Sequence, residues 1–244
     1  MILPYKLALI TLYLILLMYV LANVLLLLCV ARTKLRSFIF AFYFFCFLWA
    51  LLRATFWLGA GGVFDMSAWG VEGLFFLFWL PTSVQFCVFS LLAVFYVKIL
   101  AEQRWKTVWR ARAYSTYLLT NALLLLLTLL WAVLAGGGNG QHSELWQNIF
   151  LGFSAFLFAG LAALVAACAV LLARAPPRTR ARAFIFQPRR LLLINILLAL
   201  IFLARAVWNF LSAFNTVTLD VPLAPGADVT PVGFWLYTLW EFVP

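Results

Sequence analysis

The first apolar stretch of the chain, residues Leu7–Ala31, decides its class and reads LALITLYLILLMYVLANVLLLLCVA. A helix needs about 20 apolar residues to cross the hydrocarbon core of a bilayer, and this stretch exceeds that length without a charge. It is also longer than the apolar core of a secretory signal peptide, and no small-residue cleavage site follows it. We therefore expect a retained membrane anchor at the start of the chain.

The composition extends this conclusion to the whole chain. Of the 244 residues, 67% are hydrophobic and only 10% are charged, whereas soluble domains carry about 25% charged residues. No soluble core hides this much apolar surface, so lipid has to cover it. The net charge of +10 would suggest a nucleic-acid partner in a soluble protein, but here the basic residues follow a topological pattern and no nucleic acid is expected.

The stretches long enough to cross a membrane divide the chain at regular intervals. They cover residues 5–31, 37–59, 73–97, 113–135, 145–173 and 191–214. A last stretch, 231–244, spans only about 21 Å as a helix, against a hydrocarbon core of about 30 Å. We predict an all-α, polytopic transmembrane bundle that forms a single domain over residues 1–244. It has six full spans and a partial seventh, and we expect the sequence to stop inside the membrane, as a truncated one would.

Basic residues gather in every second loop. The loops that follow the first, third and fifth stretches hold most of the 17 Lys and Arg residues, while the loops between them carry acidic residues only. By the positive-inside rule the basic loops are cytosolic and the N-terminus is lumenal or extracellular, with Lys6 as the exception. The last basic loop forms a candidate cytosolic docking face made of Arg174, Arg178, Arg180, Arg182, Arg189 and Arg190.

Apart from Lys6 at the edge of the first stretch, three charged residues lie inside the apolar stretches: Arg53, Arg205 and Glu241. Charges at such depth are costly and mark a functional site or a specific partner. Counted at 1.5 Å per residue, all three fall in the middle-to-outer half of the bilayer. We expect Glu241 to face inward and to pair with one or both arginines, either for packing or as a binding site. For Arg53, the alternative is a side chain that reaches outward to the headgroups.

Further polar residues belong to this candidate cluster. Asn209 follows Arg205 by one helical turn and therefore shares its face. Gln85 can form hydrogen bonds across helices, and it lies one turn after Pro81, which is predicted to kink the third span. The candidate intramembrane site thus comprises Arg53, Gln85, Arg205, Asn209 and Glu241, with Pro81 as a structural kink.

Catalytic and metal-binding patterns are not recognisable. The four cysteines lie inside apolar stretches, and the single histidine, His142, sits in a glycine-rich loop without a neighbouring nucleophile or ligand cluster. We expect no enzyme activity, no cofactor and no metal site.

Four short motifs in order resemble a known family. They are Leu48-Trp-Ala-Leu-Leu-Arg53, Leu80-Pro-Thr-Ser-Val-Gln-Phe86, Ala204-Arg-Ala-Val-Trp-Asn209 and Leu239-Trp-Glu-Phe-Val-Pro244. Together they resemble the seven-transmembrane family that joins plant tobamovirus multiplication proteins with animal orphan-receptor-like lysosomal membrane proteins, and the animal branch is the closer one. The family pattern continues past the Glu-x-x-Pro of its last span, where this sequence stops.

The resemblance implies a non-enzymatic protein of lysosomal or endolysosomal membranes. Animal members of the family are linked to nutrient signalling through Rag GTPases and the TOR kinase complex. We therefore expect a scaffold or regulator that docks cytosolic small GTPases at its basic loops.

Two alternatives stay open. One is a small-solute transporter with a 3 + 1 + 3 helix repeat, because Arg53-Ala-Thr-Phe-Trp57 resembles Arg205-Ala-Val-Trp208 and Phe78-Trp-Leu-Pro81 resembles Glu241-Phe-Val-Pro244. The other is an orphan receptor-like protein, which the span count and the predicted orientation fit.

Overall fold

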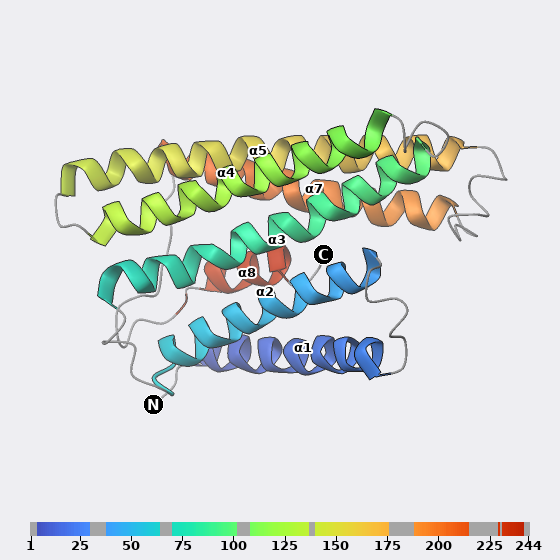
Figure 1. The fold of residues 1–244 in the computed structure, drawn as a ribbon. Coiled ribbons are helices and arrows are strands. Elements are labelled where there is room, and N and C mark those ends of the chain that lie inside the picture. The colour runs from blue at the N-terminus through green and yellow to red at the C-terminus, as the bar shows by residue number, and fades with distance from the viewer. Residues whose placement is uncertain are drawn as a thin grey trace.

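The computed structural model (Figure 1) describes residues 4–29, 38–63, 70–101, 108–136, 140–175, 188–214, 229 and 231–241. These residues form helices and no strand: α1 Pro4–Cys29, α2 Phe38–Ala60, α3 Gly70–Leu100, α4 Arg110–Gly136, α5 Gly140–Arg174, α7 Pro188–Ala213 and α8 Pro231–Glu241. Within the described residues, 6 helices are long and apolar enough to cross a membrane, and α8 is the short exception. The predicted all-α bundle with six spans and a short seventh piece is confirmed.

The outside of the bundle is apolar. Ile15, Met18, Leu119, Leu126 and Phe156 are all more than half exposed. Exposing such side chains to water costs about 25 cal/mol per Å² of apolar surface, a cost that lipid removes. The helical backbone satisfies its own hydrogen bonds, which is required where no water is present. The chain is therefore an integral, multi-pass membrane protein in contact with the lipid bilayer.

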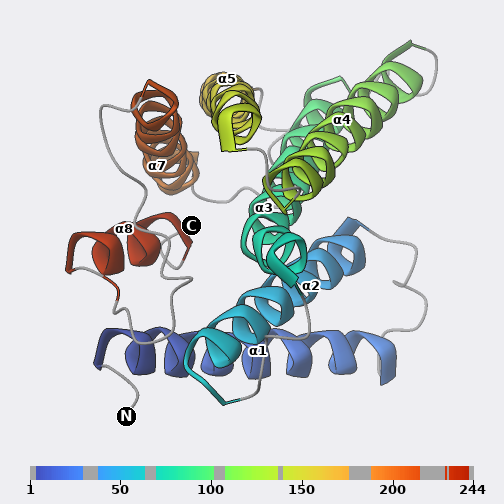
Figure 2. The same ribbon diagram turned by 90° about the vertical axis from the view of Figure 1, so that its left-hand side faces the viewer.

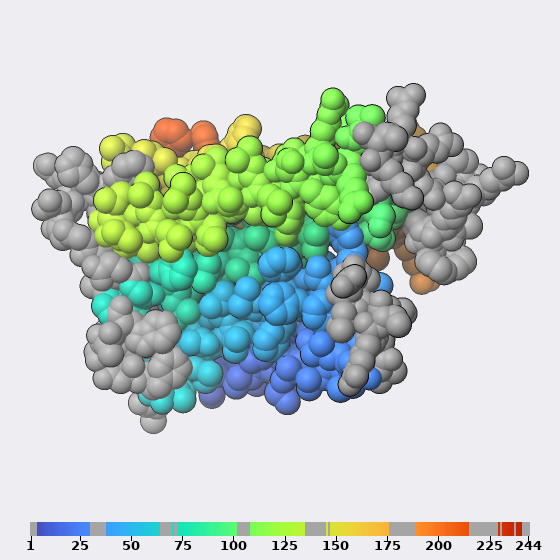
Figure 3. Space-filling model, viewed as in Figure 1, coloured from blue at the N-terminus to red at the C-terminus, as the bar shows by residue number. Residues whose placement is uncertain are grey.

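Helix α3 is the central element. It packs against α2, α4 and α5, and more than half of its most apolar segment is buried. Figure 2 shows α3 between α2 and α4, and Figure 3 shows the same order of layers on one face of the molecule. On the other side α5 packs against α7, while α8 contacts both α7 and α1. A residue on α3 can therefore reach most of the bundle.

Helix α1 crosses the bundle obliquely. In Figure 2, α5 and α7 are seen nearly end-on, whereas α1 lies across the view beneath α2. Lys6 near the start of α1 is only 3% exposed, and its Nζ donates a hydrogen bond to the Ala60 carbonyl at 3.3 Å. Ala60 is the last residue of α2, where the helix dipole presents its negative end. Lys6, the exception to the charge pattern outside the membrane, is therefore buried between two helices.

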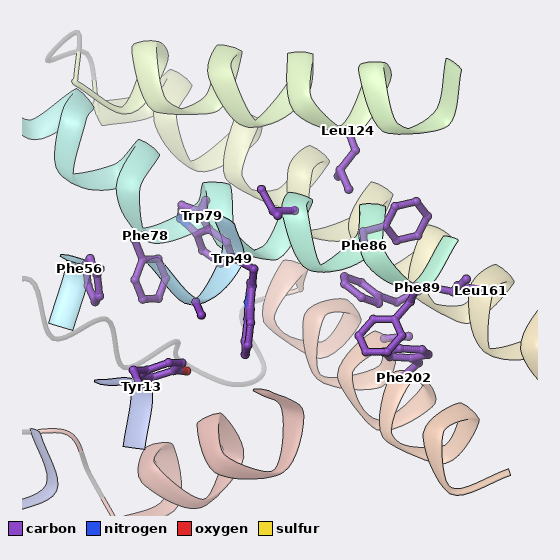
Figure 4. Packing of buried hydrophobic residues seen from close by; sticks show 14 of the residues in the cluster. Tyr13, Trp49, Phe56, Phe78, Trp79, Phe86, Phe89, Leu124, Leu161 and Phe202 are labelled. Atoms are coloured by element: carbon purple, nitrogen blue, oxygen red, sulfur yellow. The ribbon is translucent and has the colours of Figure 1, made fainter. Parts of the chain in front are cut away.

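Aromatic side chains fill the core (Figure 4). Phe56 of α2 packs against Phe78 of α3, with ring centroids 5.1 Å apart, and Trp79 of α3 packs against Phe150 of α5 at the same distance. The first pair is tilted and the second is edge-to-face, and aromatic pairs of this kind stabilise by about 0.5–1.5 kcal/mol beyond their area burial. Through them, α3 is tied to its neighbours on both sides.

Described basic residues gather at one end of the bundle. Lys98 and Arg174 lie in the last turns of α3 and α5, and Arg110 and Arg189 in the first turns of α4 and α7. In Figure 1 these four helix ends lie on the same side, the right-hand side of the view. We call it the basic end. The assignment of this end to the cytosol remains a prediction from the sequence.

Candidate functional site: a polar network inside the bundle

The Arg205 side chain of α7 is held between three helices. It is 6% exposed; its Nη1 donates a hydrogen bond to Gln85 Oε1 and its Nη2 donates to Thr82 Oγ1 at 2.9 Å. The guanidinium carbon also lies 5.0 Å from the ring centroid of Phe158 and 5.8 Å from that of Trp240. Hydrogen bonds from a charged donor and cation–π contacts both offset the cost of burying the charge.

Gln85 connects this arginine to α8. Its Oε1 accepts from Arg205, while its Nε2 donates to the Trp240 carbonyl at 2.8 Å. Thr82 and Gln85 are three residues apart on α3 and therefore share one helix face. We call Arg205, Gln85, Thr82 and the Trp240 carbonyl the polar network. It joins α7, α3 and α8 inside the bundle.

Asn209 lies one turn beyond Arg205 but has different partners. Its Nδ2 donates to Ser154 Oγ on α5 at 3.1 Å, and Ser154 in turn donates to the Leu151 carbonyl at 2.9 Å. Both side chains are buried. Asn209 therefore links α7 to α5, next to the polar network.

Arg53 forms a second, separate buried cation. It is 2% exposed, its Nη1 donates to the Phe78 carbonyl at 3.0 Å, and its guanidinium carbon lies 5.6 Å from the Phe78 ring centroid. Phe78 is next to Leu77, whose carbonyl lacks a helical donor because Pro81 has no N–H. Helix α3 nevertheless continues through Pro81 without a break. Arg53 thus holds its charge inside the bundle, at the part of α3 where proline weakens the helical hydrogen bonding.

A family model described as the GPR137 N-terminal domain matches residues 3–221. The chain belongs to the GPR137 family. The resemblance to orphan-receptor-like lysosomal membrane proteins found in the sequence is thereby confirmed. No curated protein and no solved structure matches the chain.

The GPR137 family model covers the arginines and their partners on α3, but not all of the polar network. Arg53, Gln85, Arg205 and Asn209 all lie within the matched residues, whereas Trp240 on α8 lies beyond them. The hydrogen bond from Gln85 to α8 therefore connects the part of the chain that the family model matches to a helix outside that match.

Some predicted site residues of this GPR137-family chain fall outside the described residues. Glu241 is the last residue of α8, but its side chain lies outside the described part, so its pairing with an arginine stays a prediction. Arg178, Arg180 and Arg182 also lie outside the described ranges. The other docking residues are described and exposed at the basic end: Arg174, Arg189 and Arg190.

The sequence did not single out a second polar contact between α3 and α7. Tyr96 Oη donates to Asn195 Oδ1 at 2.9 Å, and the rings of Phe89 and Phe202 lie 4.7 Å apart. On α3, Phe89 and Tyr96 are seven residues apart. On α7, the same spacing separates Asn195 from Phe202. Steps of seven recur on one helix face, so this spacing was the available signal. The two helices thus meet in layers: a polar pair, an aromatic pair and then the polar network.

Two members of the polar network, Thr82 and the Trp240 carbonyl, could not be recognised from the sequence for other reasons. Thr82 is a hydroxyl in a membrane helix, and such hydroxyls commonly bond to their own helix, as Thr55 does to the Leu51 carbonyl at 2.9 Å. The acceptor on α8 is a backbone carbonyl at Trp240, which no side-chain motif reveals. Among the described residues, no group of three or more His, Cys, Asp or Glu could hold a metal ion.

Proposed function

We propose that this protein is a non-enzymatic scaffold of the endolysosomal membrane that docks cytosolic small GTPases on its basic end. The observation that carries the proposal is the exposure of Arg174, Arg189 and Arg190 at adjoining ends of α5 and α7. These two helices pack against each other along much of their length, and this packing fixes the positions of the helix ends that carry the arginines. Membership of the GPR137 family supports the same function.

Arginine suits this role. Its planar guanidinium forms two parallel hydrogen bonds with a carboxylate or a phosphate, which gives orientation as well as attraction. A partner for the basic end would therefore carry an acidic surface. In the predicted orientation these arginines face the cytosol, where small GTPases are found.

The interior supports a scaffold more than a solute transporter. The cations inside the bundle are bonded to protein groups: Arg53 to a backbone carbonyl, and Arg205 to an amide and a hydroxyl. The cavities formed by described residues include one between α3, α4 and α5, one between α7 and α8, and one between α2 and α3. Neither Arg53 nor Arg205 lines any of these three cavities. The interior charges are thus engaged in joining helices.

Proximity labelling tests the docking proposal. A variant with Arg174→Gln, Arg189→Gln and Arg190→Gln is compared with the wild type in cells. The matched control carries Arg110→Gln and Arg112→Gln, which removes charge from α4 at the same end. We expect small GTPases to disappear from the neighbours of the first variant and to remain among those of the control.

The variants and the wild type must insert into the membrane to the same extent and in the same orientation, because these arginines also help to orient the chain. Protease protection of loop tags measures this. An unchanged set of GTPase neighbours in a correctly inserted variant would contradict the proposal. A second variant neutralised at Arg178, Arg180 and Arg182 extends the test to the rest of the candidate docking face.

A further inference from the structure

A groove of about 320 Å³ opens between α3, α4 and α5. Its floor belongs to α3, and its walls belong to α4 and α5. Most of the lining is apolar, and it includes Phe86, Ala93, Val94, Leu161 and Leu164. The volume lies at the lower end of the range for small-molecule sites, which is about 300–1,000 Å³.

The length of the groove matches one leaflet of a bilayer. Along α4 it is lined from Arg112 to Thr120, and along α3 from Phe86 to Val97. At 1.5 Å per residue, these segments run for about 12 Å and about 16 Å. One leaflet supplies about half of the 30 Å hydrocarbon core. The groove thus starts near the middle of the bundle and ends at the basic end.

The floor of the groove contains a polar group that is already bonded. Ser90 Oγ donates to the Phe86 carbonyl at 2.7 Å and accepts from Asn121 Nδ2 at 3.1 Å. Because these bonds engage the hydroxyl, the floor suits an alkyl chain better than a polar solute. Gly160 on the α5 wall widens the space, since a Cβ added there would meet no atom within 4 Å.

The end of the groove has a different character. Arg112 in the first turn of α4 and Trp109, the residue just before that helix, line this end, and both are exposed. Tryptophan favours the membrane–water interface. The arginine guanidinium is suited to bind a phosphate through paired hydrogen bonds. The groove is thus apolar over the depth of one leaflet and positively charged at its interfacial end. This combination is complementary to a phospholipid with a negatively charged headgroup.

We propose that the groove between α3, α4 and α5 is a binding site for an anionic phospholipid of the leaflet at the basic end. One acyl chain lies in the groove, beside Gly160 and Leu161, and the headgroup phosphate binds Arg112. The site is separate from the proposed GTPase docking face, whose described arginines lie on α5 and α7. It would exist whether or not a GTPase binds.

Photo-cross-linking of the full chain in nanodiscs tests the site. The probe is phosphatidylserine with a diazirine on its acyl chain, in phosphatidylcholine discs, with the adducts mapped by peptide mass spectrometry. We expect adducts on the α4 and α5 segments that line the groove. Gly160→Leu, which fills the groove, should lower these adducts at least fivefold.

The matched control is Gly152→Leu. Gly152 is also a glycine of α5 whose added Cβ would meet open space, but it lies outside the groove. It should label as the wild type does. Thr116→Phe fills the groove from the α4 side and serves as a second blocking variant if Gly160→Leu folds poorly.

The headgroup is tested with Arg112→Gln and a second probe, phosphatidylcholine with the same diazirine chain. The wild type should prefer phosphatidylserine by about fivefold, the ratio expected from one basic residue near the surface, and the variant should lose this preference. Unchanged groove adducts in both blocking variants would overturn the proposal. Equal labelling of the wild type by the two probes would also overturn it.

Discussion

Arg205 and Gln85 are 120 residues apart in the chain and lie in direct hydrogen-bond contact inside the bundle. A glutamine amide has an acceptor oxygen and a donor nitrogen, and here both are used, the oxygen by Arg205 and the nitrogen by the Trp240 carbonyl. A carboxylate could accept from the arginine but could not donate to α8. The amide is therefore the group that lets one side chain join α7 to α8.

Gln85→Leu tests this double role. The change leaves the buried Arg205 without its amide acceptor, and we expect the free energy of unfolding to fall by about 1.5–3 kcal/mol. Thermal unfolding in detergent micelles measures the loss. The double variant Gln85→Leu/Arg205→Met should recover part of it, because the stranded charge is then gone. Gln147→Leu, at a half-buried glutamine of α5, is the control and should have little effect.

A separate double-mutant cycle tests the predicted pairing of Arg205 with Glu241. Arg205→Leu and Glu241→Leu should each lower the yield of folded protein, measured by fluorescence-detected size-exclusion chromatography. If the two charges pair, the double variant recovers part of the loss. Losses that simply add would mean that Arg205 depends on its neutral partners alone.

Tyr96→Phe probes the polar layer nearer the basic end. The variant keeps the ring but removes the hydroxyl that donates to Asn195 Oδ1. We expect a loss of about 0.5–1.5 kcal/mol, the usual net value of one hydrogen bond, in chemical or thermal unfolding. Tyr19→Phe, at a tyrosine that is 61% exposed, is the control. Equal effects of the two variants would show that the Tyr96 hydroxyl contributes nothing specific.

Lys6→Met separates stability from topology. Loss of the bond to the Ala60 carbonyl should lower the free energy of unfolding by about 1–2 kcal/mol, the upper part of the range for a cation at a helix C-terminus, because Lys6 is buried. Because Lys6 is buried between α1 and α2, we expect the orientation of the chain to be unchanged in glycosylation mapping. An inverted N-terminus would instead mean that Lys6 acts during insertion, before α1 and α2 have packed.

The helices could be predicted because membrane spans depend on length and hydropathy, which are local properties. The sequence also placed Arg53 and Arg205 deep within apolar stretches, but for Arg53 it left open a side chain that reaches outward to the headgroups. Their partners did not follow. Opposite charge pointed to Glu241, whereas the described partners of Arg205 are an amide, a hydroxyl and two aromatic rings. Neutral acceptors of this kind depend on how the helices are rotated, which a single sequence does not specify.

The groove between α3, α4 and α5 was beyond sequence reasoning for a related reason. The small residues of α5 suggest close helix contact, and Ala155 is indeed 4% exposed. Gly160, however, faces open space beside α4. Whether a small residue allows two helices to approach or leaves a gap depends on the tertiary arrangement.

The layered contact between α3 and α7 restricts how this protein can change shape. Tyr96 meets Asn195, Phe89 meets Phe202, and Gln85 meets Arg205. Sliding one helix past the other by a turn, about 5.4 Å, would place rings against polar groups and break both polar layers at once. The two helices can therefore pivot or separate, but they have a single register. Any motion that transmits a signal through this bundle would have to tilt helices rather than shift them along their axes.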